Sequence, residues 1–280
     1  MATLTMSTNN LRLKTMLVPR EHGAWGMLLV PLATGAVVAS RTGLNAVALT
    51  LFVLATMSVF WLRTPLEAYL GTSAIKAQNR AERASIMQVM VLLCGVALAA
   101  LGCLFAMGFA RGLLTLGVIA AASFAAQVVV KRLGRSGRMP AQIIGAIGLT
   151  STTAGAYYVA CGRLDRTAVA LWVCNWLFAA NQVHYVQLRI RGSRIVTLRE
   201  KLQRGRWFLA GQVLLLLALA VAAGIGILPW FALLAFIPAM VRGILWFVRG
   251  IQPLDVHKLG FSELAQALLF GAILSVAFLV

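Results

Sequence analysis

The stretch LNAVALTLFVLATMSVFWL, residues 44–62, contains no charged side chain and is typical of a helix that crosses a membrane. Such a helix needs about 20 mainly apolar residues to span the hydrocarbon core of a bilayer. The chain of 280 residues is 61% hydrophobic and only 11% charged, and other segments have a similar composition. The sequence therefore predicts about nine transmembrane helices, at residues 24–40, 44–62, 84–107, 112–130, 141–160, 167–188, 207–225, 228–248 and 261–280.

The apolar runs also indicate which secondary structure crosses the membrane. Lipid offers no hydrogen-bond partner to the backbone, so only helices and closed β-barrels span a bilayer. The runs are long and lack the alternation of polar and apolar residues that barrel strands show. We therefore expect an all-α, polytopic bundle in which residues 19–280 form a single transmembrane domain, after a short polar cytoplasmic segment at residues 1–18.

Basic residues predict how the bundle is oriented. With nine spans, four of the 25 Lys and Arg residues, Arg41, Arg111, Arg163 and Arg166, fall on one side, and all the others fall on the opposite side. Because cytoplasmic loops carry an excess of Lys and Arg, the amino terminus is predicted to be cytoplasmic. The net charge of +18 lies next to membrane ends, where anionic lipid headgroups account for it, so membrane lipids rather than nucleic acid are the expected partners.

The start of the first span carries one candidate site. The sequence VPREHGAW, residues 18–25, places Glu21 and His22 just before the apolar run. One interpretation is an ordinary helix start at the membrane interface, with Trp25 as an aromatic anchor. The other is a Glu21/His22 pair that faces a substrate, because ionisable groups at a membrane boundary commonly face the interior of the bundle.

The end of the second span carries another polar cluster. In FWLRTPLE, residues 60–67, Arg63 and Glu67 are four residues apart and share a helix face. Pro65 lies between them and is expected to break or kink the helix. Arg63 alone would be typical of a basic side chain that reaches from a helix end into water, but Glu67 beside it indicates a structured polar cluster.

The end of the sixth span, NQVHYVQLRIR at residues 181–191, is the most polar membrane segment. At 100° per residue, two neighbouring stripes form on this helix. A helix end that emerges into water explains the last arginines, but it explains the deeper asparagine and histidine less well, so we predict a polar and basic cavity open to the cytosol. The first stripe contains Asn181, His184, Gln187 and Arg191, and the second contains Gln182, Tyr185 and Arg189.

Two further segments lead to structural expectations. The fifth span is rich in small residues, including Gly145 and Gly148, which predicts that neighbouring helices approach it closely. Ser262 is expected to cap the last span and Glu263 to lie in its first turn. Neither the histidines nor the cysteines have the spacing of metal ligands, so no metal site is predicted.

Three motifs resemble the YwiC-like family of bacterial integral membrane proteins. They are Pro-Arg-Glu-His-Gly-Ala-Trp at Pro19–Trp25, Arg-x-Pro-Leu at Arg63–Leu66 and Gly-x-x-Glu at Gly260–Glu263. The His-Gly-Ala-Trp element is the most specific of these motifs. The resemblance implies a multi-pass protein of the bacterial cytoplasmic (inner) membrane.

The nine-span layout is also similar to that of the UbiA superfamily of membrane prenyltransferases. In that superfamily, Asp-rich motifs at the inner ends of the second and sixth helices hold magnesium on an isoprenoid diphosphate. The matching stretches here, Arg63–Glu67 and Asn181–Arg191, contain no aspartate, and Glu67 is the one carboxylate. The resemblance therefore implies a UbiA-like arrangement of helices with weak support for bound Mg²⁺.

These clusters lead to three hypotheses for function. The first is a divergent UbiA-like prenyltransferase or lipid-modifying enzyme that acts on an isoprenoid or another anionic amphiphile. The second is a transporter or a lipid- or anion-binding membrane protein, and the third is an accessory factor for a respiratory complex. The catalytic candidates are Glu21, His22, Glu67 and His184, and the substrate-binding candidates are Arg63, Asn181, Gln187, Arg189 and Arg191.

Overall fold

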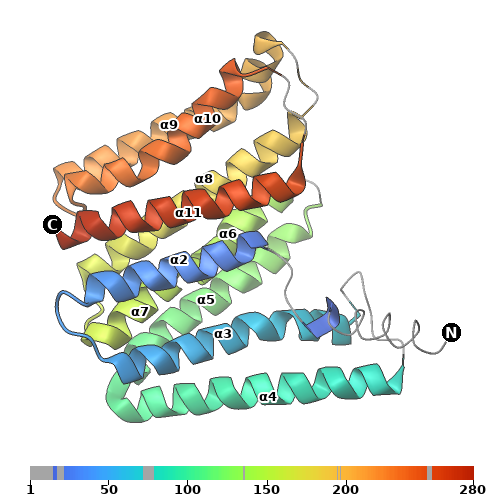
Figure 1. Ribbon diagram of the computed structural model, residues 1–280, viewed down its shortest axis with the longest axis vertical. Coiled ribbons are helices and arrows are strands. Elements are labelled where there is room, and N and C mark those ends of the chain that lie inside the picture. The colour runs from blue at the N-terminus through green and yellow to red at the C-terminus, as the bar shows by residue number, and fades with distance from the viewer. Residues whose placement is uncertain are drawn as a thin grey trace. The chain divides into compact units, whose positions relative to one another are not determined.

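The fold was analysed in a computed structural model, which describes residues 15–17, 22–71, 79–134, 136–193, 195, 197–250 and 254–280, with side chains omitted at 22–24. The described residues form helices and connecting turns, without a β-strand (Figure 1). The elements are α2 (His22–Ala39), α3 (Ala46–Tyr69), α4 (Arg80–Leu104), the π-helical turn η1 (Phe105–Phe109), α5 (Ala110–Lys131), α6 (Arg138–Thr150), α7 (Thr152–Cys161), α8 (Arg166–Arg191), α9 (Leu198–Gly224), the 3₁₀ helix η2 (Trp230–Phe236), α10 (Ile237–Val248) and α11 (Val256–Leu279).

All nine predicted spans are helical, which confirms the all-α, polytopic bundle. Seven helices in the described part of the chain are long and apolar enough to cross a membrane. The apolar part of α2 is shorter, and α8 is more polar than the others, so the spanning role of these two helices stays a prediction. The seven are Ala46–Tyr69, Arg80–Ala106, Ala110–Lys131, Arg138–Cys161, Leu198–Gly224, Trp230–Val248 and Val256–Leu279.

The chain divides into two compact units, and each is described by itself. Unit 1 comprises Met1–Glu21 and Ala46–Ala110, and unit 2 comprises His22–Asn45 and Arg111–Val280. In unit 1, α3 and α4 pack along each other. Met16 is buried with side chains of both helices, and the helical turn at residues 15–17 is attached to α3 by a hydrogen bond from Trp61 Nε1 to the carbonyl of Leu17 (2.6 Å).

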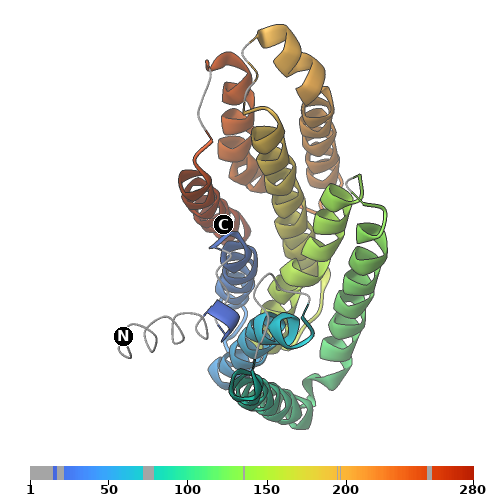
Figure 2. The ribbon, with the colours of Figure 1, turned by 90° about the vertical axis from the view of Figure 1, so that its right-hand side faces the viewer.

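In unit 2, α8 is the helix around which the others are arranged. It contacts α6, α7, α9 and α10, and Figure 2 shows these helices around it. Helix α2 packs against α7 and α11, and α11 packs against η2 (Figure 1). This arrangement brings residues from α8, α9, α10 and α11 together although they are far apart in the sequence.

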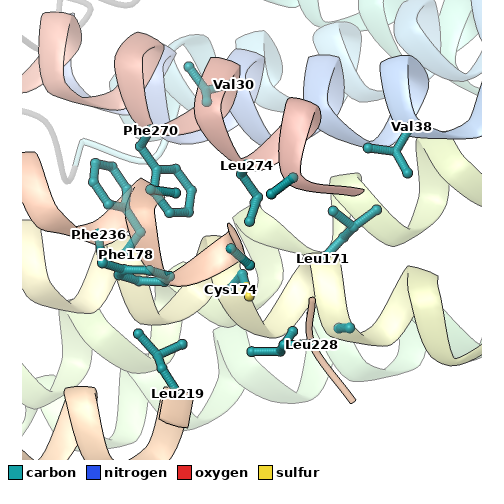
Figure 3. Close-up of a cluster of buried hydrophobic side chains, with 14 of the residues drawn as sticks. Val30, Val38, Leu171, Cys174, Phe178, Leu219, Leu228, Phe236, Phe270 and Leu274 are labelled. Atoms are coloured by element: carbon teal, nitrogen blue, oxygen red, sulfur yellow. The ribbon is translucent and has the colours of Figure 1, made fainter. Parts of the chain in front are cut away.

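Stacked aromatic rings hold the centre of unit 2 together. Phe178 of α8 stacks on Phe270 of α11 with ring centroids 3.9 Å apart, and Phe236 of η2 meets Phe270 edge-on at 5.1 Å (Figure 3). All three side chains are buried. Such aromatic pairs add about 1 kcal/mol each to the stabilisation that comes from burial, so they fix α8 relative to α11.

Small residues allow the close helix approach that the sequence predicts. A Cβ atom on Gly145 would lie 2.6 Å from the side chain of Gln127, and one on Gly148 would lie 2.7 Å from Ser123 Oγ. Both neighbours belong to α5, so α5 and α6 approach closely at these glycines. The same holds for α2 and α7, where a Cβ on Gly35 would lie 2.1 Å from the backbone oxygen of Thr153.

Two local predictions are wrong, the first of them in part. Pro65 does not end α3, which continues to Tyr69, because a proline in the last turns of a helix can remove one hydrogen bond without ending the helix. The kink expected at Pro65 stays a prediction. Helix α11 begins at Val256, where the side chain of Asp255 accepts a hydrogen bond from the Lys258 amide (3.1 Å). This cap extends the helix by more than a turn, so Glu263 lies inside α11 rather than in its first turn.

Candidate functional site

The two candidate residues of α3 form an ion pair in unit 1. Arg63 Nε donates a hydrogen bond to Glu67 Oε1 at 2.9 Å, as the spacing of four residues predicts. The two side chains are 47% and 45% exposed. An exposed pair of this kind contributes less than about 1 kcal/mol to stability, and a role in binding remains a prediction.

The candidate pair at the start of the first span is not described. Glu21 lies outside the described residues, and His22 is the first residue of α2 but its side chain is not described. Trp25, which follows them, is half-buried and does have an interaction within the protein.

The polar side chains of α8 contact several neighbouring helices in unit 2. Asn181 is buried, and its Oδ1 accepts a hydrogen bond from Gln212 Nε2 of α9 at 2.6 Å. His184 is half-buried and meets the ring of Phe208 edge-on at 5.2 Å. Gln187 donates to Gln142 Oε1 of α6 at 3.3 Å, whereas Arg191 is exposed.

The strongest polar contact in unit 2 joins α10 to α11. Arg242 Nη1 donates to Glu263 Oε1 at 2.6 Å, and Nη2 donates to Glu263 Oε2 at 3.1 Å. The two side chains are only 14% and 9% exposed. Arg242 Nη1 also donates to Ser262 Oγ at 3.3 Å, and its guanidinium lies over the ring of Tyr185 of α8, 4.2 Å from the centroid. A two-point contact and a stacked ring together fix the plane of this guanidinium.

Positive charge exceeds negative charge around Tyr185. Arg189, Arg242, Arg249 and Glu263 all lie close enough to the Tyr185 hydroxyl to interact with it electrostatically. Arg189 is only 9% exposed and makes no hydrogen bond or ion pair with a described residue. Arg242 is the guanidinium that pairs with Glu263, whereas Arg189 and Arg249 share only the neighbourhood of Tyr185, and we name these five residues the basic cluster.

The basic cluster has a second sign of incomplete pairing. The Nε atom of Arg242 is buried and has no hydrogen-bond partner among the described residues. Buried polar groups are nearly always paired, so an unpaired one indicates a missing partner such as water or a ligand. Arg242 Nε and the guanidinium of Arg189 are therefore two sets of N–H donors without a partner among the described residues.

A buried lysine lies beside the basic cluster. Lys201 of α9 donates through Nζ to the carbonyls of Trp246 (3.3 Å) and Arg249, at the carboxyl end of α10. Its Nζ also lies over the ring of Trp246 at 5.4 Å. Lys201 thus completes the end of α10 and adds a further positive charge near Arg249.

Glu263 is also connected to α8 through its backbone. Gln182 Nε2 donates to the carbonyl oxygen of Glu263 at 3.0 Å, and Gln182 is buried.

A cavity of about 10 Å³ lies next to Gln182, which is room for about one water molecule. This cavity does not accommodate an isoprenoid chain. Its lining is Gly26, Met27, Val30, Pro31, Thr150, Asn175, Phe178, Ala179, Gln182 and Ala267.

The described residues do not fit the two-magnesium site that the UbiA resemblance implies. Among them, no group of three or more His, Cys, Asp or Glu side chains is arranged to hold a metal ion. Residues 181–191 of α8 contain no carboxylate, and Glu67 is paired with Arg63. We therefore derive no chemistry from bound magnesium.

Arg242 and Glu263 were missed as site residues by the sequence analysis, which counted Arg242 among the cytoplasmic charges and assigned Glu263 to a helix start. A signal was present, because Arg242 lies within an apolar segment, and ionisable residues at such positions are commonly functional. The sequence did not identify Glu263 as the partner of Arg242, because the two residues are on different helices.

The fold and the cluster define an integral membrane protein, a helical bundle with charged side chains buried between its helices. The family model described as YwiC-like protein matches residues 18–158, half of the chain. The chain therefore belongs to the YwiC-like family, as its motifs predict. Neither the curated proteins nor the solved structures gave a match. Helices α8 to α11, which carry the basic cluster, lie outside the matched residues.

Proposed function

We propose that this membrane protein binds a phosphate- or carboxylate-bearing anion in the basic cluster, and that the anion is the headgroup of an amphiphile. The observation that carries the proposal is Arg189, whose side chain is only 9% exposed and makes no hydrogen bond or ion pair with a described residue. A buried charge costs several kcal/mol unless it is paired. An anion at this position would remove that cost.

The chemistry of the cluster suits this class of ligand. Guanidinium groups bind phosphates and carboxylates through parallel N–H donors, which gives both strength and geometric selectivity. Arg189 contributes its whole guanidinium, and Arg242 contributes its unpaired Nε. The positive-inside pattern predicts that this end of the bundle faces the cytosol.

The surface beside the cluster favours an amphiphile over a free anion. Val248, next to Arg249, is 71% exposed, and Trp207, next to the buried Phe208, is 70% exposed. Exposed apolar side chains on membrane helices contact acyl chains, so the tail of a bound lipid would lie along this surface. Binding or transport of such a ligand is therefore preferred to isoprenoid transfer, for which the residues described here provide no metal site.

Isothermal titration of the purified protein in a neutral detergent tests the proposal. The probes are dihexanoyl phosphatidylglycerol, dimethyl phosphate as a free anion of the same charge, and zwitterionic dihexanoyl phosphatidylcholine as a control. We expect phosphatidylglycerol to bind and Arg189→Gln to weaken its binding by about 30-fold or more, which corresponds to about 2 kcal/mol. The exposed Arg204 of α9 provides a matched control, because Arg204→Gln removes the same charge away from the cluster.

The outcomes separate the possible ligands. Equal affinity for dimethyl phosphate and phosphatidylglycerol would assign the site to a free anion and overturn the lipid part of the proposal. Equal weakening by Arg189→Gln and Arg204→Gln would show that the overall charge of the protein, and not the cluster, binds the anion. Absence of binding to either anionic probe would overturn the proposal as a whole.

A further inference from the structure

We propose that anion binding at the basic cluster is coupled to uptake of one proton by Glu263, because the anion replaces this carboxylate on Arg242. The inference rests on the proposed function and adds an activity to it. A protein with this property binds an anion and a proton together, and if it also transports the anion it moves both in the same direction.

The geometry of Arg242 places Glu263 where a ligand anion would bind. Both terminal nitrogens of the guanidinium donate to the two carboxylate oxygens, at 2.6 and 3.1 Å. A phosphate or carboxylate ligand uses the same two-point contact. The ring of Tyr185 covers one face of the guanidinium and holds it in position. A ligand that takes both terminal nitrogens of Arg242 in this way must therefore displace Glu263.

The displaced carboxylate leaves Arg242, its one ion-pair partner among the described residues. The side chains of α2 from residue 25 onward, and those of η2, include no ionisable group. On α8, Gln182 and Tyr185 are neutral, and the guanidinium of Arg189 is taken by the anion in the proposed complex. Arg249 is the C-cap residue of α10, its own carbonyl accepts from Lys201, and it is exposed.

The cost of a buried, unpaired charge then determines the protonation state of Glu263. A carboxylate that is 9% exposed and has lost its guanidinium carries a large desolvation cost, whereas the neutral acid does not. A proton from water on the side to which the site opens forms an O–H bond with Glu263. The resulting carboxylic acid is a hydrogen-bond donor, and the bound anion is the acceptor beside it.

The displacement requires only a side-chain rotation. Gln182 Nε2 donates to the backbone oxygen of Glu263, not to its carboxylate, so this contact between α8 and α11 persists when the side chain moves. Ser262 accepts from Arg242 at 3.3 Å and likewise does not depend on the Glu263 carboxylate. The helices can therefore keep their packing while the ion pair opens.

The test measures affinity for dihexanoyl phosphatidylglycerol, whose phosphodiester keeps its charge, between about pH 6 and about pH 8. If one proton is taken up per anion, the affinity of the natural protein falls by up to about tenfold for each unit by which the pH rises. Titrations in buffers with different ionisation enthalpies give the number of protons directly, and we expect about one. Glu263→Gln should bind more tightly than the natural protein at about pH 8 and lose the pH dependence.

Control variants distinguish Glu263 from other groups. Glu200 is an exposed glutamate in the first turn of α9, so Glu200→Gln should keep the pH dependence. His184 is a second ionisable side chain on α8, and it packs against Phe208 of α9. If His184→Gln removed the pH dependence while Glu263→Gln kept it, the proton would belong to His184 and the inference would be overturned.

The failure of this inference differs from failure of the proposed function. Binding of phosphatidylglycerol with no proton uptake and no pH dependence refutes the coupling and leaves anion binding intact. Absence of binding at every pH refutes both. Because the proton count is measured on the natural protein, the test does not depend on the folding of Glu263→Gln.

Discussion

The ion pair between Arg242 and Glu263 can be tested for energetic coupling by a double-mutant cycle. The three variants are Arg242→Met, Glu263→Leu and the double variant. Each single substitution leaves one charge buried without its partner, whereas the double substitution leaves an apolar contact between α10 and α11. The contrast between the single variants and the double variant is the measured quantity.

The structure sets the expected magnitudes. The donor and acceptor atoms are 2.6 and 3.1 Å apart, and the side chains are 14% and 9% exposed, so solvent screens the pair little. Breaking such a pair by removing one partner costs about 3 to 5 kcal/mol. Glu263→Leu is expected at the low end, because Arg242 keeps Ser262 and Tyr185 as neighbours. The double variant should cost about 2 kcal/mol or less, well below the sum of the single variants.

Unfolding can be followed by circular dichroism during titration of neutral micelles with sodium dodecyl sulfate. The pair Lys258–Asp255 provides a control, because its atoms are 3.8 Å apart and its side chains are far more exposed, so Lys258→Met should cost less than about 1 kcal/mol. Additive costs in the double variant would refute the coupling of Arg242 with Glu263. Single variants that cost as little as Lys258→Met would show that the pair is not shielded from solvent.

Two further predictions concern packing and topology. Gly35→Ala should destabilise the protein by about 2 kcal/mol or more, because its methyl group would lie 2.1 Å from the backbone oxygen of Thr153. As a control, Gly95→Ala in the exposed interior of α4 should be neutral or stabilise the protein by up to about 1 kcal/mol. Unfolding in detergent measures both changes in stability. In a protein with its native cysteines replaced, a membrane-impermeant maleimide should label Arg163→Cys in intact cells and Ser136→Cys only in inverted vesicles, and the reverse pattern would contradict the predicted orientation.

The helices could be predicted from sequence because one quantity dominates membrane insertion, the length of an apolar run. Their interruptions could not. The segment predicted at 141–160 is two helices, α6 and α7, which meet at Ser151. Near this junction, Thr150 Oγ1 donates to the carbonyl of Ala146 (2.7 Å) and Ser151 Oγ donates to that of Gly148 (2.7 Å). Hydroxyl groups that bond to backbone carbonyls occur in continuous helices as well, so this pattern does not predict where a helix ends.

The candidate site was predictable only where a single helix shows it. The polar stripe of α8 indicated that Asn181 faces the protein interior, and Asn181 is buried. The burial of Arg189 was not predicted, because an arginine at a helix end is equally typical of a side chain that reaches into water. The stripe gave no information about which side chains of other helices these residues meet. Gln212 is on α9, Arg242 on α10 and Glu263 on α11, and periodicity describes one helix at a time. Pairing between helices depends on the tertiary fold, which is why the ion pair was missed.

The basic cluster is difficult to explain as a device for stability. A buried ion pair is commonly replaceable by apolar side chains without loss of stability, and an unpaired buried arginine lowers it. On the proposed function, we expect the largely buried Arg189 to cost folding free energy in the absence of an anion. If that is correct, Arg189→Gln should leave the unliganded protein as stable as the natural one or more stable, while it abolishes the stabilisation that phosphatidylglycerol gives to the natural protein. If Arg189 had a structural role, Arg189→Gln would instead destabilise the unliganded protein. An unfolding experiment with and without the lipid therefore distinguishes a residue kept for binding from one kept for folding.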